Sequence, residues 1–303
     1  MKIVVTGASG LVGTALQPEL KAKGHEVYRL VRGAADKAAG AIVWNPEQET
    51  IDAASLEGID AVVHLAGESV SEGRWTEEKK RRIRESRAQG TRLLSETLAG
   101  LKSKPRVLLS ASATGFYGSR GDEILTEQSA SGADFLSEVC REWELSTQPA
   151  SQAGIRVANL RFGVILSAEG GALKKMLTPF KLGVGGKVGS GEQYMSWIAI
   201  DDAVGAILFA LEKETVRGPV NVVAPHAVTN LEYTKTLGVV LSRPTIFFVP
   251  KFAARMAFGE VADALLLSSA RVEPLRLKEA GYQFKYPQLE GALRHVLHEE
   301  TKG

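Results

Sequence analysis

Three glycines near the start of the chain have the spacing of a phosphate-binding turn. Gly7, Gly10 and Gly13 lie in Thr6-Gly-Ala-Ser-Gly-Leu-Val-Gly13, directly after a strand-like run at residues 2–6. Glycines so placed permit a tight turn, the close approach of a pyrophosphate and close packing of a helix on a strand. The following helix presents free N–H groups and a positive dipole to phosphate. Isolated glycine turns are also structural, but this strand-turn-helix order favours dinucleotide binding.

The next expected strand ends in a cation instead of a carboxylate. It covers Glu26 to Val31 and is followed by Arg32, at the point where an acidic residue usually binds the ribose diol of NAD. A planar guanidinium pairs with a 2′-phosphate through two parallel hydrogen bonds. Arg32 therefore favours NADP(H) over NAD(H); the alternative is a solvated loop residue.

A corner of small residues follows a third expected strand. The stretch His64-Leu-Ala-Gly-Glu68 ends the apolar run that begins at Asp60. Small residues allow backbone to approach a ligand, so we expect this corner to lie against the cofactor ribose. The alternative is that Ala66 and Gly67 merely end a buried strand.

A basic helix is expected from about Thr76 to Leu101. Residues 74–87 contain seven basic and three acidic side chains, and most of these form a solvated face. Arg87 differs, because it shares a helical stripe with Ile83 and Leu94 and therefore faces inward. A buried arginine needs a partner, and a bound phosphate is a good candidate.

The order of elements predicts the fold class. Short strands alternate with helices through the first half of the chain, with further strands at residues 41–44, 106–110, 156–166 and 218–223. This alternation predicts an α/β fold, a doubly wound parallel sheet of the Rossmann type with its ligand at the carboxyl ends of the strands.

The later part of the chain predicts a smaller C-terminal subdomain on the substrate side. A glycine-rich stretch at 183–191 predicts a mobile loop over a cleft. From Pro244 onward we expect a strand, a helix at Lys251–Phe258, a second helix near Leu265 and a last helix from Leu289. We assign residues 1–167 and 197–225 to the NADP-binding domain. Residues 168–196 and 226–303 form the substrate-side subdomain.

Several of these stretches are similar to the extended short-chain dehydrogenase/reductase superfamily. They are the glycine turn, the His64–Glu68 corner and Ser110-Ala-Ser-Ala-Thr-Gly-Phe-Tyr-Gly118, which resembles the serine-containing strand end of that superfamily. Residues 185–202, 221–225 and 249–287 resemble its atypical branch, the epimerase family, which is related to nucleotide-sugar epimerases and has its own C-terminal domain. The resemblance implies NADP(H) contacts at Gly7, Ser9, Gly10, Leu11, Val12, Gly13, Val31, Arg32, Leu65, Ala66, Gly67, Arg82, Arg87 and Ile165.

The resemblance breaks at the usual catalytic pair. Superfamily enzymes use a tyrosine as general acid/base, with a lysine four residues later that lowers the phenol pKa. The corresponding segment here, residues 134–143, places Phe135 and Val139 at these two positions. Neither side chain can move a proton. No tyrosine lies between Gly118 and Tyr194, so shifting the alignment does not restore the pair.

Two side chains remain as candidates for catalysis. Ser112 matches the superfamily serine that hydrogen-bonds a substrate carbonyl or hydroxyl; the alternative is an ordinary buried serine. Tyr117 is the nearest phenol and could replace the missing acid, although an aromatic residue in a loop more often serves packing. Gln193, Tyr194 and Trp197 follow the glycine-rich stretch and are candidates to line a substrate pocket, with Trp197 alternatively in the core.

Composition excludes several other classes of protein. A single cysteine, Cys140, excludes a disulfide scaffold, and the five histidines lack metal-ligand spacing, so we expect no metal. The net charge of +2 argues against a nucleic-acid partner, and the longest apolar stretch, Ala203–Leu211, is too short to cross a bilayer. We expect a cytoplasmic protein without a membrane partner, and a homodimer stays open.

Two functions are consistent with these observations. The first is an NADP(H)-dependent oxidoreductase or epimerase acting on a small carbonyl compound or a sugar nucleotide. The second is a non-catalytic NADP(H)-binding regulatory or redox-sensing protein that kept the cofactor site and lost the catalytic pair. The missing tyrosine and lysine favour the second function, whereas the intact glycine turn and the aromatic residues of the expected cleft favour the first.

Overall fold

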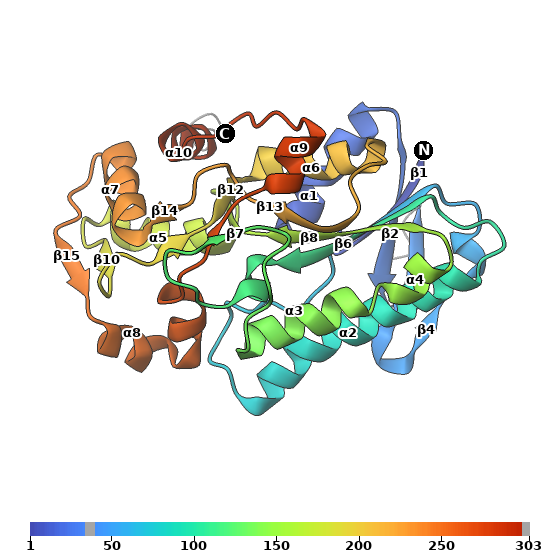
Figure 1. Cartoon of the computed structure of the whole chain (residues 1–303), viewed down its shortest axis with the longest axis horizontal. Helices are drawn as coiled ribbons and strands as arrows, with labels where there is room; N and C mark the ends of the chain where they lie inside the picture. The colour runs from blue at the N-terminus through green and yellow to red at the C-terminus, as the bar shows by residue number, and fades with distance from the viewer. Residues whose placement is uncertain (34–39, 299–303) are drawn as a thin grey trace.

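The computed structural model describes residues 1–33 and 40–298 and centres on one sheet (Figure 1). Every neighbouring pair in it is parallel except β3 and β4. Its eight strands, in spatial order, are β13 (Gly218–Val222), β8 (Arg156–Phe162), β6 (Val107–Ala113), β5 (Ala61–His64), β1 (Lys2–Thr6), β2 (Glu26–Arg32), β3 (Ala41–Asn45) and β4 (Thr50–Ile51).

The chain reverses its direction across the sheet next to β1. It builds β2 and β3 outward on one side of β1, and β5, β6, β8 and β13 outward on the other. The reversal leaves a crevice beyond the carboxyl ends of β1 and β5, where Thr6 pairs with His64. The predicted doubly wound parallel sheet is confirmed, and the glycine turn lies at its switch point.

Helices cover both faces of the sheet, as Figure 1 shows. Val5 on β1, Leu16 and Ile207 are fully buried in the core of one face, and Val62, Leu94 and Leu108 in that of the other. Strands buried on both sides explain the continuous apolar runs in the sequence. The first face carries α1 (Leu11–Ala22), α6 (Ile200–Glu212) and α9 (Leu275–Ala280); the second carries α2 (Glu77–Gly100), α3 (Phe135–Leu145) and α4 (Gln148–Gln152).

The strand expected at residues 156–166 is divided in two by Gly163. A Cβ atom at Gly163 would lie 2.6 Å from the carbonyl oxygen of Ser196, so only glycine permits this close crossing. The chain then leaves the main sheet, and β9 (Val164–Leu166) pairs instead with β12 (Trp197–Ala199). The strand expected at 106–110 is longer than predicted and reaches Ala113.

Later elements gather at the end of the molecule furthest from β2 and β4 (Figure 1). The glycine-rich stretch, which we expected to be a mobile loop, contains β10, and this strand pairs with β15. The helix expected near Leu265 is the π-helical turn η5. These elements are α5 (Gly171–Lys181), β10 (Gly186–Val188), α7 (Asn230–Leu241), β15 (Phe247–Val249), α8 (Lys251–Phe258) and η5 (Ala262–Leu266). The proposed division into two domains stays a prediction.

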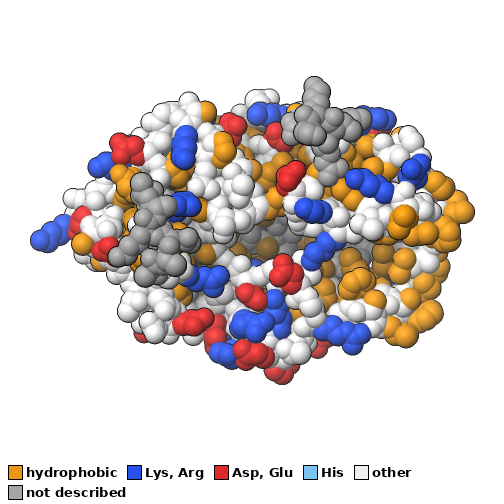
Figure 2. Space-filling view, turned by 180° about the vertical axis from the view of Figure 1, so that it is seen from behind, with side chains coloured by type: hydrophobic (Ala, Val, Ile, Leu, Met, Phe, Trp, Pro, Cys, Tyr) orange, Lys and Arg blue, Asp and Glu red, His pale blue; other side chains and the backbone are white. Residues whose placement is uncertain are grey.

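The remaining helices and strands of the described residues are short elements and one last helix. They are η2 (Pro46–Gln48), η3 (Ala54–Leu56), η4 (Thr114–Tyr117), β7 (Ile124–Leu125), β11 (Tyr194–Met195), β14 (Val228–Thr229), β16 (Arg271–Val272) and α10 (Leu289–His298). Figure 2 shows hydrophobic side chains gathered at the end that carries β15 and α8, where Ile246, Phe252 and Met256 are exposed. Within residues 1–33 and 40–298, no helix is both long and apolar enough to span a membrane.

We expect Gly13→Ala to destabilise the protein by about 2–3 kcal/mol, because overpacking against rigid backbone has no easy relaxation. A Cβ atom at Gly13 would lie 2.3 Å from the carbonyl oxygen of Gly7. Urea unfolding measures the effect. The matched control is Gly291→Ala in α10, where no atom lies within 4 Å of the new methyl group and a gain of about 0.5–1 kcal/mol is expected. Equal midpoints for Gly13→Ala and wild type would contradict the close-contact argument.

Candidate functional site

A groove with a volume of about 530 Å³ lies at the carboxyl ends of β1, β2 and β5. It occupies the switch point of the sheet, where α/β folds of this topology bind their ligands. Most of the residues expected to contact a cofactor line it: Gly7, Ser9, Gly10, Val31, Arg32, Leu65, Ala66, Gly67 and Arg82.

The glycine turn forms one end of this groove. Gly7 has φ +63°, and a Cβ atom there would lie 2.7 Å from the carbonyl carbon of Leu65, so the two strand ends meet only because Gly7 has no side chain. Gly10 is the N-cap of α1. In the first turn of this helix, all of which the structure describes, no side chain caps the backbone N–H groups and no residue is acidic. The turn therefore offers an open backbone cradle and a positive helix end to an anion.

A buried hydrogen-bonded chain fixes the wall of the groove. Thr6 Oγ1 accepts hydrogen bonds from the backbone N–H groups of Leu65 and Ala66 at 3.0 and 3.1 Å. It also lies 2.7 Å from His64 Nδ1, and His64 Nε2 lies 2.9 Å from Thr91 Oγ1 on α2. Burial lowers the pKa of His64 to about 4, so the imidazole is neutral at physiological pH.

Two cations, Arg32 and Arg82, line the groove. Both interact with the charge of Glu68, whose carboxylate is bound by Lys79 at 2.7 Å. That hydrogen bond, together with the charges of Lys79, Arg82 and Arg32, lowers the pKa of Glu68. Arg82 Nε is 3.7 Å from the same carboxylate, and the Arg32 side chain is exposed. Because Lys79 compensates Glu68, Arg32 and Arg82 keep donors for a phosphate group.

Arg87 faces inward, as its helical stripe predicts. Its guanidinium donates to the carbonyl of Ile83 at 3.1 Å and lies 4.9 Å from the centre of the Trp143 ring. A Cβ atom at Gly67 would be 3.3 Å from Arg87 Cζ, so the arginine lies directly under the small-residue corner. Burial lowers the pKa of Arg87.

Five of the expected cofactor contacts do not line the groove. Arg87 is one of them, and three others are Leu11, Val12 and Gly13 of α1. Ile165 on β9 is likewise outside it.

Ser112 is buried at the end of β6 and belongs to a closed polar network. Its Oγ donates to Glu144 Oε1 at 2.7 Å. Arg161 on the adjacent β8 holds both oxygens of Glu144, with Nε–Oε1 at 2.7 Å and Nη2–Oε2 at 2.8 Å. The Arg161 guanidinium also lies 3.4 Å from the centre of the Phe116 ring. The serine is therefore oriented by a carboxylate whose own position is fixed.

Tyr117 is fully buried at the other end of the same network. Its hydroxyl donates to Asn221 Oδ1 at 2.7 Å and accepts from Arg161 Nη1 at 2.9 Å. Burial raises its pKa, which works against proton release. Its role as an acid stays a prediction, and this geometry is evidence for the structural alternative.

The positions of the usual catalytic pair serve packing in α3. Phe135 stacks edge to face on Trp75 with ring centres 5.2 Å apart, and Val139 is 2% exposed. Cys140 is also buried, which raises the pKa of its thiol to about 12. Across residues 1–33 and 40–298 no group of three potential ligands could hold a metal ion.

The three expected substrate residues do not converge on one cavity. The side-chain amide of Gln193 donates hydrogen bonds to the carbonyls of Val188 and Leu266, and these bonds anchor the loop after β10. Tyr194 is half-buried, with the guanidinium of Arg271 5.1 Å from its ring centre. Trp197 is fully buried and donates to the carbonyl of His226, so the expectation that it lines a pocket is wrong and the core alternative describes it.

Comparison with known proteins gives the family. A model of the NAD dependent epimerase/dehydratase family matches residues 3–224. The chain belongs to this family. A second model, a domain of unknown function called DUF1731, matches residues 249–296, within the part of the chain assigned above to the smaller subdomain.

Similar proteins cover the full length of the chain. Epimerase family protein Mb2239 of Mycobacterium bovis is 41% identical over 294 residues, which are 97% of each sequence. The crystal structure of human epimerase family protein SDR39U1 with NADPH has a TM-score of 0.91 at 33% identity, covering 98% of this chain and 99% of that one. A nucleoside-diphosphate sugar epimerase from Corynebacterium glutamicum has a TM-score of 0.82 at 41% identity, covering 98% of this chain and 58% of that one. The predicted resemblance to the epimerase family is confirmed.

Sequence reasoning missed Glu144 and Arg161, which orient Ser112. One signal was available, because Arg161 interrupts the apolar strand Val157-Ala-Asn-Leu-Arg-Phe162 and a buried arginine requires an acidic partner. Further residues that line the groove were also missed: Arg29, Trp44, Asn45, Pro46, Glu47, Ser69, Glu85, Ser86 and Gln89.

We expect Tyr117→Phe to lower the free energy of unfolding by about 1–3 kcal/mol, because it leaves Arg161 Nη1 and Asn221 Oδ1 unpaired in the interior. Chemical denaturation of both proteins provides the measurement. Tyr194→Phe is the matched control, since this half-buried ring lies outside the network, and its effect should stay within about 0.5 kcal/mol. If Tyr117→Phe were as stable as wild type, the hydroxyl group of Tyr117 would have no structural role.

Proposed function

We propose that this protein binds NADP(H) in the groove at the switch point. The observation that carries the proposal is that two cations, Arg32 and Arg82, line the same groove as the uncapped glycine turn. A dinucleotide has a pyrophosphate for the turn, and NADP(H) has an additional 2′-phosphate for the cations. The crystal structure of the human relative with NADPH supports the choice of cofactor.

The residues present fit this cofactor. The backbone cradle at Gly7 and Gly10 would hold the pyrophosphate, Leu65 to Gly67 would line the adenosine side, and Arg32 would bind the 2′-phosphate. When bound, the nicotinamide exchanges a hydride with a carbon atom of the substrate. The neutral His64 holds the groove wall without adding a charge of its own.

The activity that we propose is an oxidoreductase or epimerase reaction on a small carbonyl compound or a sugar nucleotide. Ser112 is the group proposed to orient the substrate, because it lies at the end of β6 with its hydroxyl fixed by Glu144. The family assignment and the Corynebacterium relative, which is described as a sugar epimerase, support this reaction class. A small molecule is the proposed partner, whereas the cytoplasmic location and a homodimer stay predictions.

One observation favours a second function. Phe135 and Val139 pack into α3 at the positions of the usual tyrosine and lysine, and the hydroxyl of Tyr117 is committed to Arg161 and Asn221. A protein that holds NADP(H) and lacks a proton donor would act as a regulatory or redox-sensing protein. Turnover measurements separate the two functions.

We expect Arg32→Ala to weaken NADPH binding by about 10- to 100-fold and to leave NADH binding unchanged, because a charge-assisted hydrogen bond contributes about 1.5–3 kcal/mol. Fluorescence titration with both nucleotides measures the effect. Arg92→Ala, an exposed arginine on α2 away from the groove, controls for the loss of one positive charge. Equal loss of affinity for NADPH and NADH would overturn the assignment of Arg32 to the 2′-phosphate.

The reaction class is tested by following NADPH absorbance with a panel of aldehydes, ketones and sugar nucleotides. Any epimerisation is read by product analysis. For a substrate found in this way, we expect Ser112→Ala to lower kcat/KM by about 100-fold at unchanged NADPH affinity. Ser110→Ala, two residues earlier on the same buried strand, should keep the wild-type rate. Tight NADPH binding without turnover of any panel member would instead favour the regulatory function.

A further inference from the structure

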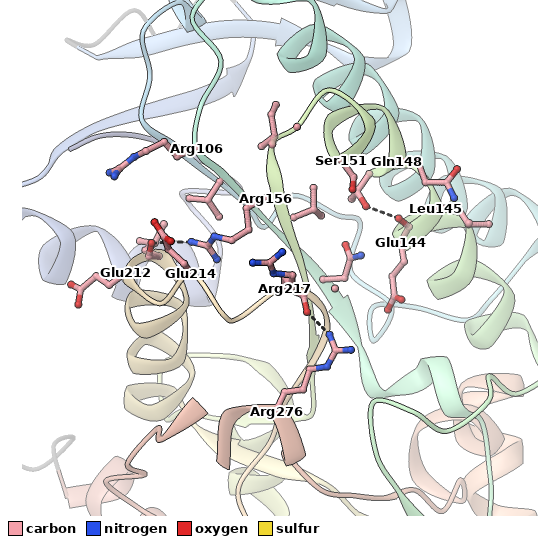
Figure 3. A pocket seen from close by; sticks show the side chains of 18 of the residues that line it. Arg106, Glu144, Leu145, Gln148, Ser151, Arg156, Glu212, Glu214, Arg217 and Arg276 are labelled. Atoms are coloured by element: carbon pink, nitrogen blue, oxygen red, sulfur yellow. Dashed lines mark hydrogen bonds between the residues drawn. The ribbon is translucent and has the colours of Figure 1, made fainter. Parts of the chain in front are cut away.

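Several arginines lie close together at the amino ends of the strands, whereas the glycine turn lies at their carboxyl ends. Arg106 directly precedes β6, Arg156 begins β8 and Arg217 directly precedes β13, so three adjacent parallel strands each start with a guanidinium group. Arg276 at the start of α9 joins them by donating to the carbonyl of Arg217. Figure 3 shows these four side chains around a cavity of about 1140 Å³.

Arg156 is fixed in place by backbone carbonyl groups. Its Nη1 donates to the carbonyls of Ala210 and Val216 at 3.0 and 2.8 Å, and its Nη2 to that of Leu211 at 3.1 Å. Carbonyl groups satisfy its donors but remain neutral overall. Burial lowers the pKa of Arg156, and the nearby charges of Arg217 and Arg106 lower it further, whereas Glu214 opposes them. The guanidinium groups therefore repel one another in this cavity.

The carboxylates around the cavity do not balance these charges. Glu144 is bound on both oxygens by Arg161, and Glu212 pairs with Lys23 at 3.2 Å. Among the described lining residues this leaves Glu214 with five arginines, the four named above and Arg141. Like charges gathered in one cavity destabilise a protein, and a bound anion would remove that repulsion.

A buried amide indicates a further feature of the ligand. Asn159 lies on β8 beyond Arg156, lines the same cavity and is 8% exposed. Its Oδ1 has no hydrogen-bond partner among the residues that the structure describes. Buried acceptors are normally paired, so a hydroxyl or amine donor on an occupant of the cavity would satisfy this oxygen.

We propose that the cavity is a binding site for a small molecule that carries at least two anionic groups and a hydroxyl group. Sugar phosphates and hydroxycarboxylates both have this chemistry. The anionic groups bind Arg106, Arg217 and Arg276, and the hydroxyl donates to Asn159. The site lies at the amino ends of the strands and is separate from the cofactor groove at their carboxyl ends.

The test uses citrate and fructose 1,6-bisphosphate as probes of the carboxylate and phosphate forms of this chemistry. Calorimetric titration of the full-length protein, with and without saturating NADPH, is expected to show saturable binding of at least one probe in both conditions. Binding that disappears when NADPH is added would place the anion in the cofactor groove and overturn the proposal. A wild-type protein that binds neither probe would also overturn it. Because NADPH-free protein is included, failure of the proposed cofactor does not affect this result.

Matched variants locate the site. The double variant Arg106→Gln, Arg217→Gln changes two exposed side chains and should weaken binding of the probe by about 100-fold, or about tenfold for each lost ionic hydrogen bond. The control Arg92→Gln, Lys235→Gln removes the same charge from exposed positions elsewhere and should bind as wild type does. Equal weakening in both variants would show a diffuse charge effect and contradict the site. Circular dichroism of each variant verifies that it is folded.

Discussion

The buried contact between the ends of β1 and β5 determines the geometry of the cofactor groove. Thr6 Oγ1 accepts two backbone N–H groups, from Leu65 and Ala66, and these bonds use both of its lone pairs. Its single hydrogen must therefore be donated to His64 Nδ1. The imidazole then carries its proton on Nε2 and donates it to Thr91. One tautomer of a neutral histidine thus connects two strands and α2. Gly7 can then approach Leu65 closely because it has no side chain.

The parts of this arrangement that depend on neighbouring residues in the chain could be predicted from the sequence. The turn from Gly7 to Gly13 follows from glycine conformational freedom, and Arg32 follows from where β2 ends. The pairing of Arg161 with Glu144 could not be located, because it joins β8 to α3 and depends on how those elements pack. Trp197 was misplaced because β12 has only three residues, too few for a periodic pattern to tell a core face from an exposed one.

The two edges of the sheet carry cations in different electrostatic settings. At the carboxyl ends of the strands, Glu68 is compensated by Lys79, and Arg32 and Arg82 line a groove together with the uncharged backbone of the glycine turn. At the amino edge, Arg156 is held by carbonyls near the carboxyl end of α6, where the helix dipole is negative and stabilises a cation. The fold itself can therefore hold this partly buried arginine there, whereas the Arg106 and Arg217 side chains are exposed.

The hydrogen-bond direction at Ser112 limits which substrates it can orient. Its hydroxyl hydrogen is donated to Glu144, and Arg161 holds that carboxylate in place through two hydrogen bonds. The serine then has only lone pairs left for a ligand, which accept a hydrogen bond and cannot donate one. A substrate carbonyl oxygen needs a donor, so it would have to break the bond to Glu144, whereas an alcohol can donate to Ser112 without disturbing the network. This geometry favours contact between Ser112 and a hydroxyl group of the substrate over direct polarisation of a carbonyl group.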